Sequence, residues 1–142
     1  MVRFLYDQRC YEIKEKLLNG QTLFIHFQEM ENSKDCRNYN ICLGIYNKRK
    51  HAVRNEEEVR ITGKSPFLNV YKAIKMFDEI EQYVLDECRE REENVRFWVG
   101  WVDNRRRDAY YKVLSKRGYD YQTMWGKKQL IKRVDYAHTT CE

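Results

Sequence analysis

The chain has 142 residues, of which 42% are apolar and 35% are charged, and it contains a single proline. This balance is typical of one globular domain with a charged surface and excludes a disordered chain. The net charge of +5 allows a nucleic-acid or acidic-protein partner without requiring one. The apolar runs are too short to span a bilayer, so we expect no membrane association.

The N-terminus and the cysteines both indicate the reducing cytoplasm. Residues 1–7 already contain charged residues, which leaves no room there for the apolar segment of a signal peptide. The chain has five cysteines, Cys10, Cys36, Cys42, Cys88 and Cys141, an odd number without short paired spacings. We therefore expect free thiols and no disulfide. His26 with Cys36 and Cys42 is a conceivable metal cluster, but ordinary packing roles are the expectation, so no metal site is predicted.

The first part of the chain carries one helix signal and three strand signals. Cys10, Ile13 and Leu17 recur at helical spacing and Gly20 follows as a stop, which predicts a helix. Strands are predicted over residues 22–27, 40–46 and 57–62, with a polar loop over 29–38 and a basic turn over 48–51.

The helix predicted over residues 66–89 has the strongest local signals. Ser65 can cap its first turn, and Pro66 occupies the first helical position, where a missing N–H costs nothing. Apolar residues then follow at intervals of three and four: Val70, Ala73, Ile74, Phe77, Ile80 and Val84. We expect this stripe to be buried against a sheet.

The last part of the chain predicts a strand, a helix and a hairpin. Residues 95–102 are apolar at the positions that would face either side of a strand. This pattern predicts a central strand covered on both faces. A helix capped by Asp103 or Asn104 is closed by Gly118. Its expected inner side consists of Ala109, Tyr110, Val113 and Leu114. Strands over 119–125 and 129–134 flank a turn at Gly126-Lys127.

This order of elements resembles the GNAT-type N-acetyltransferase fold. The stretch from Asn104 to Gly118-Tyr119 is similar to the family's asparagine-containing helix, which follows a strand and ends in a glycine and an aromatic residue. The chain also resembles small bacteriophage proteins with a GNAT-like layout, because Arg107, Tyr111 and Leu114 match their Arg, three residues, Tyr, two residues, Leu motif.

The resemblance implies an α+β fold with a GNAT-like mixed, largely antiparallel sheet and helices on both faces. The chain length fits a single domain, which we place over residues 1–134; residues 135–142 have little to bury and are expected to form a flexible tail. The resemblance places Gly63, Lys64 and Ser65 where the family has its acetyl-CoA phosphate loop, so these three residues are the cofactor-binding candidates.

That loop departs from the family pattern, which has more than one small residue. Here Gly63 is the only glycine, Pro66 lacks an N–H donor, and bulky Phe67 and Leu68 follow. Because a pyrophosphate needs converging backbone N–H groups at a helix start, we expect acetyl-CoA to bind weakly or not at all. A nucleotide-binding P-loop would need glycine at Glu58, so a helix cap is the alternative role of Ser65.

Two further groups of residues are candidates for a catalytic or a binding role. Tyr111 is the candidate catalytic residue, a general acid for a leaving thiolate, with packing as its alternative role. The basic residues Arg105, Arg106, Arg107, Lys127 and Lys128 lie near aromatic residues in sequence and are nucleic-acid candidates. Their alternative role is a solvated charged surface.

The sequence therefore predicts an accessory or regulatory protein of a bacteriophage or mobile element. It would bind a host protein or a small ligand on a degenerate acetyltransferase-like scaffold, without a cofactor. One alternative is an active N-acyltransferase that uses acetyl-CoA. A second alternative is a nucleic-acid-binding accessory protein. Fold alone does not choose among them.

Overall fold

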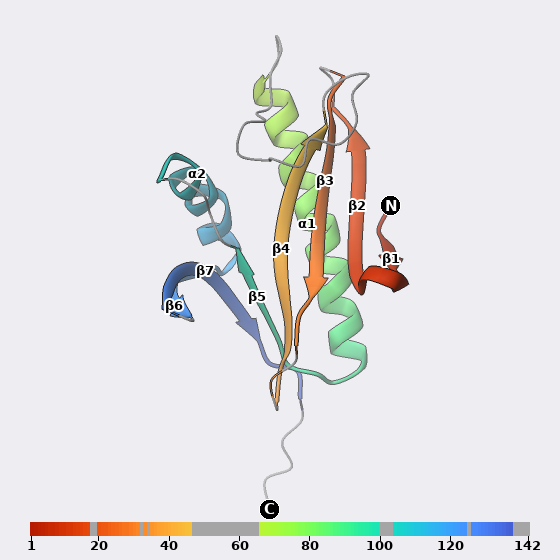
Figure 1. The fold of residues 1–142 in the computed structure, drawn as a ribbon, viewed down its shortest axis with the longest axis vertical. Helices are drawn as coiled ribbons and strands as arrows, with labels where there is room; N and C mark the ends of the chain where they lie inside the picture. The colour runs from red at the N-terminus through yellow and green to blue at the C-terminus, as the bar shows by residue number, and fades with distance from the viewer. Residues whose placement is uncertain are drawn as a thin grey trace, which may run out of the picture. The chain divides into compact units, whose positions relative to one another are not determined.

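The fold of the chain is known from a computed structural model, which describes residues 1–17, 20–31, 33, 35–46, 66–99, 104–124 and 126–137. For Tyr46, residues 66–69 and residues 104–107 it describes the backbone alone. The described part is α+β, with one seven-stranded sheet and two α-helices (Figure 1).

The elements follow one another in this order: β1 (Arg3–Leu5), a 3-10 turn (Tyr6–Gln8), β2 (Cys10–Lys16), β3 (Thr22–Glu29), β4 (Arg37–Tyr46), α1 (Pro66–Glu90), β5 (Val95–Val99), α2 (Asn104–Leu114), a 3-10 turn (Ser115–Arg117), β6 (Asp120–Met124) and β7 (Lys127–Val134). The strands lie in the order β1-β2-β3-β4-β5-β7-β6. Strands β4 and β5 pair in parallel, and the segment between them contains α1. The pairs β1–β2, β2–β3, β5–β7 and β6–β7 are antiparallel, so the expected mixed, largely antiparallel sheet is confirmed.

The chain forms two compact units. Unit 1 consists of residues 1–28 and 42–83, and unit 2 consists of residues 29–41 and 84–142. The single domain expected over residues 1–134 and the helices expected on both faces of the sheet stay predictions.

The helix predicted from Cys10 to Leu17 is wrong, because this segment is strand β2. All seven of its residues pair with β3, from Cys10 opposite Gln28 to Lys16 opposite Thr22. Four consecutive residues, from Cys10 to Ile13, are buried, whereas a helix would expose some of them. Gly20 has a φ of 89° and stands in the connection to β3. A glycine with a positive φ can end a helix, but here it belongs to the turn between the paired strands β2 and β3.

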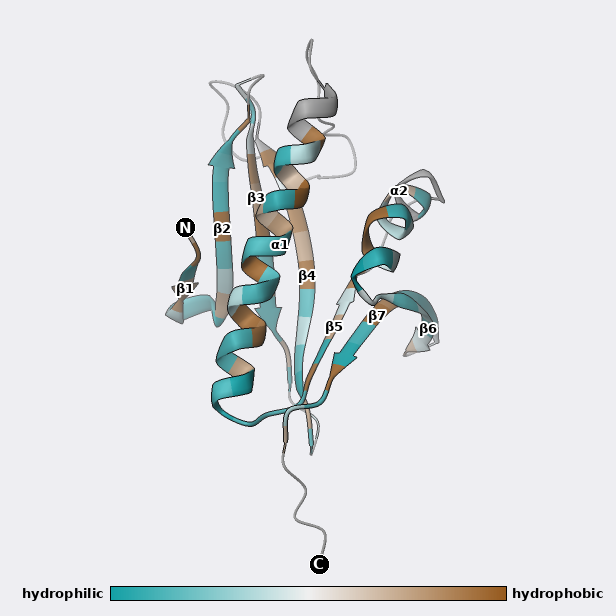
Figure 2. Cartoon of the chain, turned by 180° about the vertical axis from the view of Figure 1, so that it is seen from behind, coloured by the Kyte–Doolittle hydropathy of each residue, from teal (hydrophilic) through white to brown (hydrophobic). Residues whose placement is uncertain are grey.

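In unit 1, helix α1 packs on one face of the sheet. The Phe77 ring lies 5.9 Å from that of Phe27, and the Tyr83 ring lies 5.9 Å from that of Tyr11. Helix α1 confirms the predicted element, and Phe77, Ile80 and Val84 are buried as expected. Figure 2 shows hydrophilic residues along much of the helix surface.

Three details of the predicted helix stripe need correction. Val70 is 42% exposed and Ile74 is half-buried, because the first buried residue of the described helix comes six residues after Val70. Met76, which the stripe omitted, is 1% exposed. The apolar face of the described helix therefore starts at Met76.

In unit 2, strand β5 lies between β4 and β7 and is buried at Val95, Phe97, Trp98 and Val99. This confirms a central strand. Helix α1 ends before it at Glu90, and Glu92, two residues later, has a φ of 57°. The Glu92 N–H donates to the Arg89 carbonyl and the Glu93 N–H to the Cys88 carbonyl. These two bonds satisfy carbonyls of the last helical turn.

Helix α2 and the following hairpin also match the prediction. Gly118 has a φ of 92°, and the Tyr119 N–H donates to the Leu114 carbonyl, which closes the helix. Leu114 is buried as expected, but Ala109 is exposed, so the predicted inner side is wrong at that position. Strands β6 and β7 pair around Gly126, which has a φ of 74°.

Several predicted features lie outside the described residues. These are the basic turn at 48–51, the strand at 57–62, the Ser65 cap and the tail beyond 137. The predicted loop over 29–38 is shorter than expected, because β3 reaches Glu29 and β4 begins at Arg37. Neither α1 nor α2, as far as they are described, is long and apolar enough to cross a membrane.

Candidate functional site

The candidate catalytic residue, Tyr111, lies in a ring stack on unit 2. Its ring is parallel to the Tyr121 ring, with an interplanar angle of 4° and centroids 4.8 Å apart. The ammonium group of Lys128 lies 4.7 Å from the centroid of Tyr121. We call Tyr111, Tyr121 and Lys128 the tyrosine–lysine stack. It joins residues of α2, β6 and β7.

The strand register explains this arrangement. Thr123 pairs with Lys128 and Tyr121 pairs with Leu130, and residues two apart on a strand point to the same face. Lys128 therefore shares a face with Tyr121. Tyr111 is 39% exposed, so the stack lies at the protein surface.

A second lysine and tyrosine lie next to the stack. The Lys132 ammonium is 5.6 Å from the Tyr119 ring centroid, and Lys132 stands on the same face of β7 as Lys128. Tyr119 is only 2% exposed, so it packs in the core. Tyr111 is thus the exposed ring of this group.

The other nucleic-acid candidates are placed in part. Arg105, Arg106 and Arg107 belong to the first turn of α2, where the structure describes the backbone alone. Lys127 begins β7 and is exposed, as is Lys128. The structure therefore brings Lys128 to Tyr121, the ring that stacks on Tyr111, whereas the three arginine side chains stay outside the description.

The cofactor candidates Gly63, Lys64 and Ser65 lie outside the described residues. Their expected role at a phosphate loop stays a prediction.

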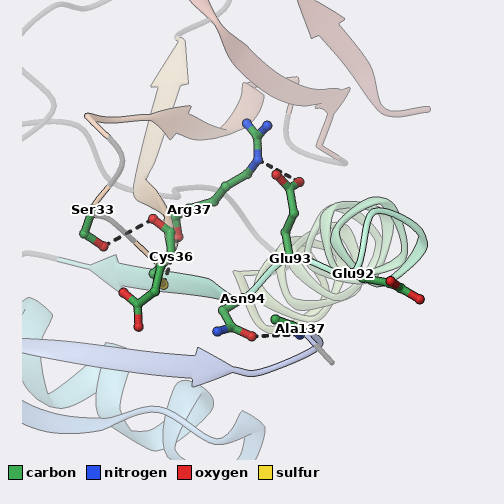
Figure 3. A pocket seen from close by; sticks show the side chains of 8 residues that line it. Ser33, Cys36, Arg37, Glu92, Glu93, Asn94 and Ala137 are labelled. Carbon is green, nitrogen blue, oxygen red and sulfur yellow. Dashed lines mark hydrogen bonds and ion pairs between the residues drawn. The ribbon is translucent and has the colours of Figure 1, made fainter. Parts of the chain in front are cut away.

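Unit 2 also contains a pocket of about 400 Å³ (Figure 3). Its lining includes the turn before β4, the segment between α1 and β5, and the chain after β7: Ser33, Asp35, Cys36, Arg37, Glu92, Glu93, Asn94 and Ala137. The Asn94 Oδ1 accepts the N–H of Tyr136 at 3.0 Å and that of Ala137 at 2.9 Å. Asn94 therefore ties the chain after β7 to the start of β5.

Arg37 lies in this pocket between two carboxylates. Its Nε donates to Glu93 Oε1 at 2.8 Å, and its Nη1 lies 3.1 Å from Glu29 Oε2. The hydrogen bond to Glu93 raises the pKa of Arg37 despite the opposing effect of burial. Since both carboxylates already neutralise the guanidinium, we assign it a structural role in holding the parallel strand pair.

Sequence reasoning missed this ion pair, because its partners are 56 residues apart. The parallel register supplies the missing link, since Arg37 stands opposite Val95, two residues after Glu93. No local motif marks such a pair, and only the β4–β5 pairing could have found it.

Unit 1 contains a buried carboxylate, Glu12, on the sheet face opposite Tyr11. An Arg3 guanidinium nitrogen donates to it, and His26 Nε2 lies 2.7 Å from its Oε2. Burial alone would raise the pKa of Glu12, but the hydrogen bonds from Arg3 and His26 outweigh burial and lower it. Glu12 is therefore held as a charged carboxylate across three strands, β1, β2 and β3.

The cysteines that the structure describes are free thiols: Cys10, Cys36, Cys42 and Cys88. Burial raises the pKa of Cys10 to about 12 and that of Cys88 to about 11. Buried protonated thiols are poor nucleophiles and poor metal ligands. Within the described ranges, no group of three or more His, Cys, Asp or Glu side chains is arranged to hold a metal ion.

Comparison with protein-family models, with curated proteins and with solved structures finds no significant match for this chain.

Proposed function

We propose that the chain is a binding or regulatory protein on an acetyltransferase-like scaffold, and not an acyltransferase. The order of the described elements supports the scaffold. Strands come first, a long helix then joins the parallel strands β4 and β5, and α2 and a closing hairpin follow. The strand β2, where a helix was expected, is a departure from that layout.

The observation that carries the proposal is the position of Tyr111. One face of its ring is covered by Tyr121, and the Lys128 ammonium lies over the Tyr121 ring. A general acid works best when it is aimed at a leaving group in a site that excludes water. Tyr111 is instead an exposed member of a surface stack, an arrangement suited to contact with a ligand.

The sequence before α1 adds an independent argument. A single glycine, Gly63, precedes a proline and two bulky residues. Such a loop offers fewer converging N–H donors for a pyrophosphate than the family pattern does. The origin in a phage or mobile element and a host-protein partner stay predictions.

The test is an assay for free CoA thiol, with acetyl-CoA and a lysine-containing peptide as probes. We expect release at the rate of the buffer control. Release above that rate, abolished by Tyr111→Phe, would show an enzyme whose acid is the Tyr111 phenol. Tyr121→Phe is the matched control, because it removes a hydroxyl from the partner ring alone.

A further inference from the structure

The basic residues of the chain are concentrated in one segment of unit 2. Residues 104–134 contain ten basic and two acidic residues, a net charge of +8, whereas the whole chain has +5. Helix α1 has the opposite balance, with three basic and six acidic residues. The positive charge therefore accumulates on α2, β6 and β7, which hold the tyrosine–lysine stack.

The stack presents an aromatic surface within this positive region. Tyr121 stacks on the Tyr111 ring, and Tyr111 remains 39% exposed. A planar ligand ring that stacked on Tyr111 would extend the stack to a third ring. The parallel geometry at 4.8 Å is a geometry in which aromatic rings attract.

Lysines flank this surface on two elements. Lys128 belongs to the stack on β7, and Lys112 follows Tyr111 on α2. Both are exposed. No salt bridge is described for either of them, so the described structure leaves their charges available for an anionic ligand.

An exposed aromatic ring beside lysines without a described salt bridge matches one class of ligand. Single-stranded nucleic acid offers flat bases for stacking and phosphates for the cations. A duplex hides its base faces, and an acidic peptide would use the lysines without needing the stacked ring. We propose that the tyrosine–lysine stack binds single-stranded nucleic acid, with a base stacked on Tyr111 and phosphates contacting the neighbouring lysines.

This inference rests on the proposed function, since it names the ligand of a binding protein. The two can fail separately. Release of CoA would refute the proposed function, whereas lack of oligonucleotide binding would refute the ligand and leave a binding protein of another kind.

The test measures fluorescence anisotropy of labelled oligo(dT) and oligo(U), each about 12 nucleotides long, in roughly 50 mM salt. We expect binding of at least one, and Tyr111→Ala should weaken it by about tenfold, the usual effect of losing one base-stacking ring. Tyr111→Phe should bind like the unaltered protein, because it keeps the ring. Lys128→Gln should flatten the dependence of log K on log salt by about one contact.

Tyr71→Ala is the matched control. Tyr71 is an exposed tyrosine with the Lys75 ammonium 5.4 Å from its ring centroid, but it stands on the acidic helix α1. It should leave affinity unchanged. Equal loss in both alanine variants, equal affinity for a duplex of the same length, or no binding of either oligonucleotide would each overturn the proposal. If Tyr111→Ala lowers the Tm, Lys128→Gln and the duplex comparison still decide the matter.

Discussion

Replacing Gly44 by alanine should destabilise unit 1 through a single aromatic contact. Gly44 lies on β4 beneath the Phe24 ring of β3, and a Cβ at this position would stand 1.9 Å from Phe24 Cζ and 2.3 Å from its Cε1. Gly44 does not have a positive φ, so its backbone accepts alanine. The ring must therefore move, and it would leave both its buried position and its contact with His26 at 4.7 Å.

The expected cost follows from two opposing terms. Losing the burial of a phenylalanine costs about 1.5–3 kcal/mol. Alanine in place of glycine in a strand recovers about 0.5–1 kcal/mol. We expect Gly44→Ala to lower the free energy of unfolding by roughly 1–2 kcal/mol, as measured by urea denaturation.

A double-mutant cycle isolates the cause. In a Phe24→Ala background the obstacle is gone, so adding Gly44→Ala should be neutral or should stabilise by up to about 1 kcal/mol. Gly126→Ala is the control, because Gly126 has a φ of 74° and a Cβ added there would meet nothing within 4 Å. Its cost should be the same in both backgrounds. An equal cost of Gly44→Ala with and without Phe24 would refute the reasoning.

Three further outcomes follow from the described packing and charges. Phe77→Ala should cost about 3–5 kcal/mol in urea denaturation, whereas Val70→Ala on the same helix, at a 42% exposed position, should stay within about 0.5 kcal/mol; similar costs would contradict the burial pattern of α1. The pKa of Glu12 is lowered in the folded protein, so the contribution of this carboxylate to the free energy of unfolding should be present above the ordinary pKa of glutamate and be lost as the pH falls through the lowered value. Glu12→Gln should therefore reduce the loss of stability at acidic pH. An unchanged loss of stability in this variant would refute the argument. Thiol titration of the denatured chain should find five free groups. In the native protein at about pH 8, mass spectrometry should show slow alkylation of Cys10 and Cys88, because their raised pKa values keep them protonated. Rapid modification of either thiol would contradict their burial.

Local signals were enough to predict the second half of the chain. Pro66 fixes the start of α1, Gly118 closes the segment after α2, and Gly126 marks the turn between β6 and β7. Each signal reflects a backbone preference of the residue itself. Such features can be read from the sequence because they do not depend on distant partners.

Strand β2 could not be predicted in the same way. Cys10, Ile13 and Leu17 fit a helical stripe, but pairing with β3 overrides that spacing. The tyrosine–lysine stack has the same origin, since Tyr111 and Tyr121 meet only when α2 lies beside the hairpin. The sequence named Tyr111 and Lys128 as candidates for two separate roles, and the tertiary structure brings both of them to Tyr121.

The central claim is that this scaffold binds a ligand at the tyrosine–lysine stack instead of using acetyl-CoA. The most direct measurement is the Tm of the purified protein, taken side by side with millimolar acetyl-CoA and with oligo(dT) at saturating concentration. A ligand at about a hundred times its Kd stabilises a protein by about 2.7 kcal/mol, which is a clear thermal shift. We predict a shift with the oligonucleotide and none with acetyl-CoA. A shift with acetyl-CoA that disappears on changing Lys64 or Ser65 would contradict the account and show a working cofactor loop.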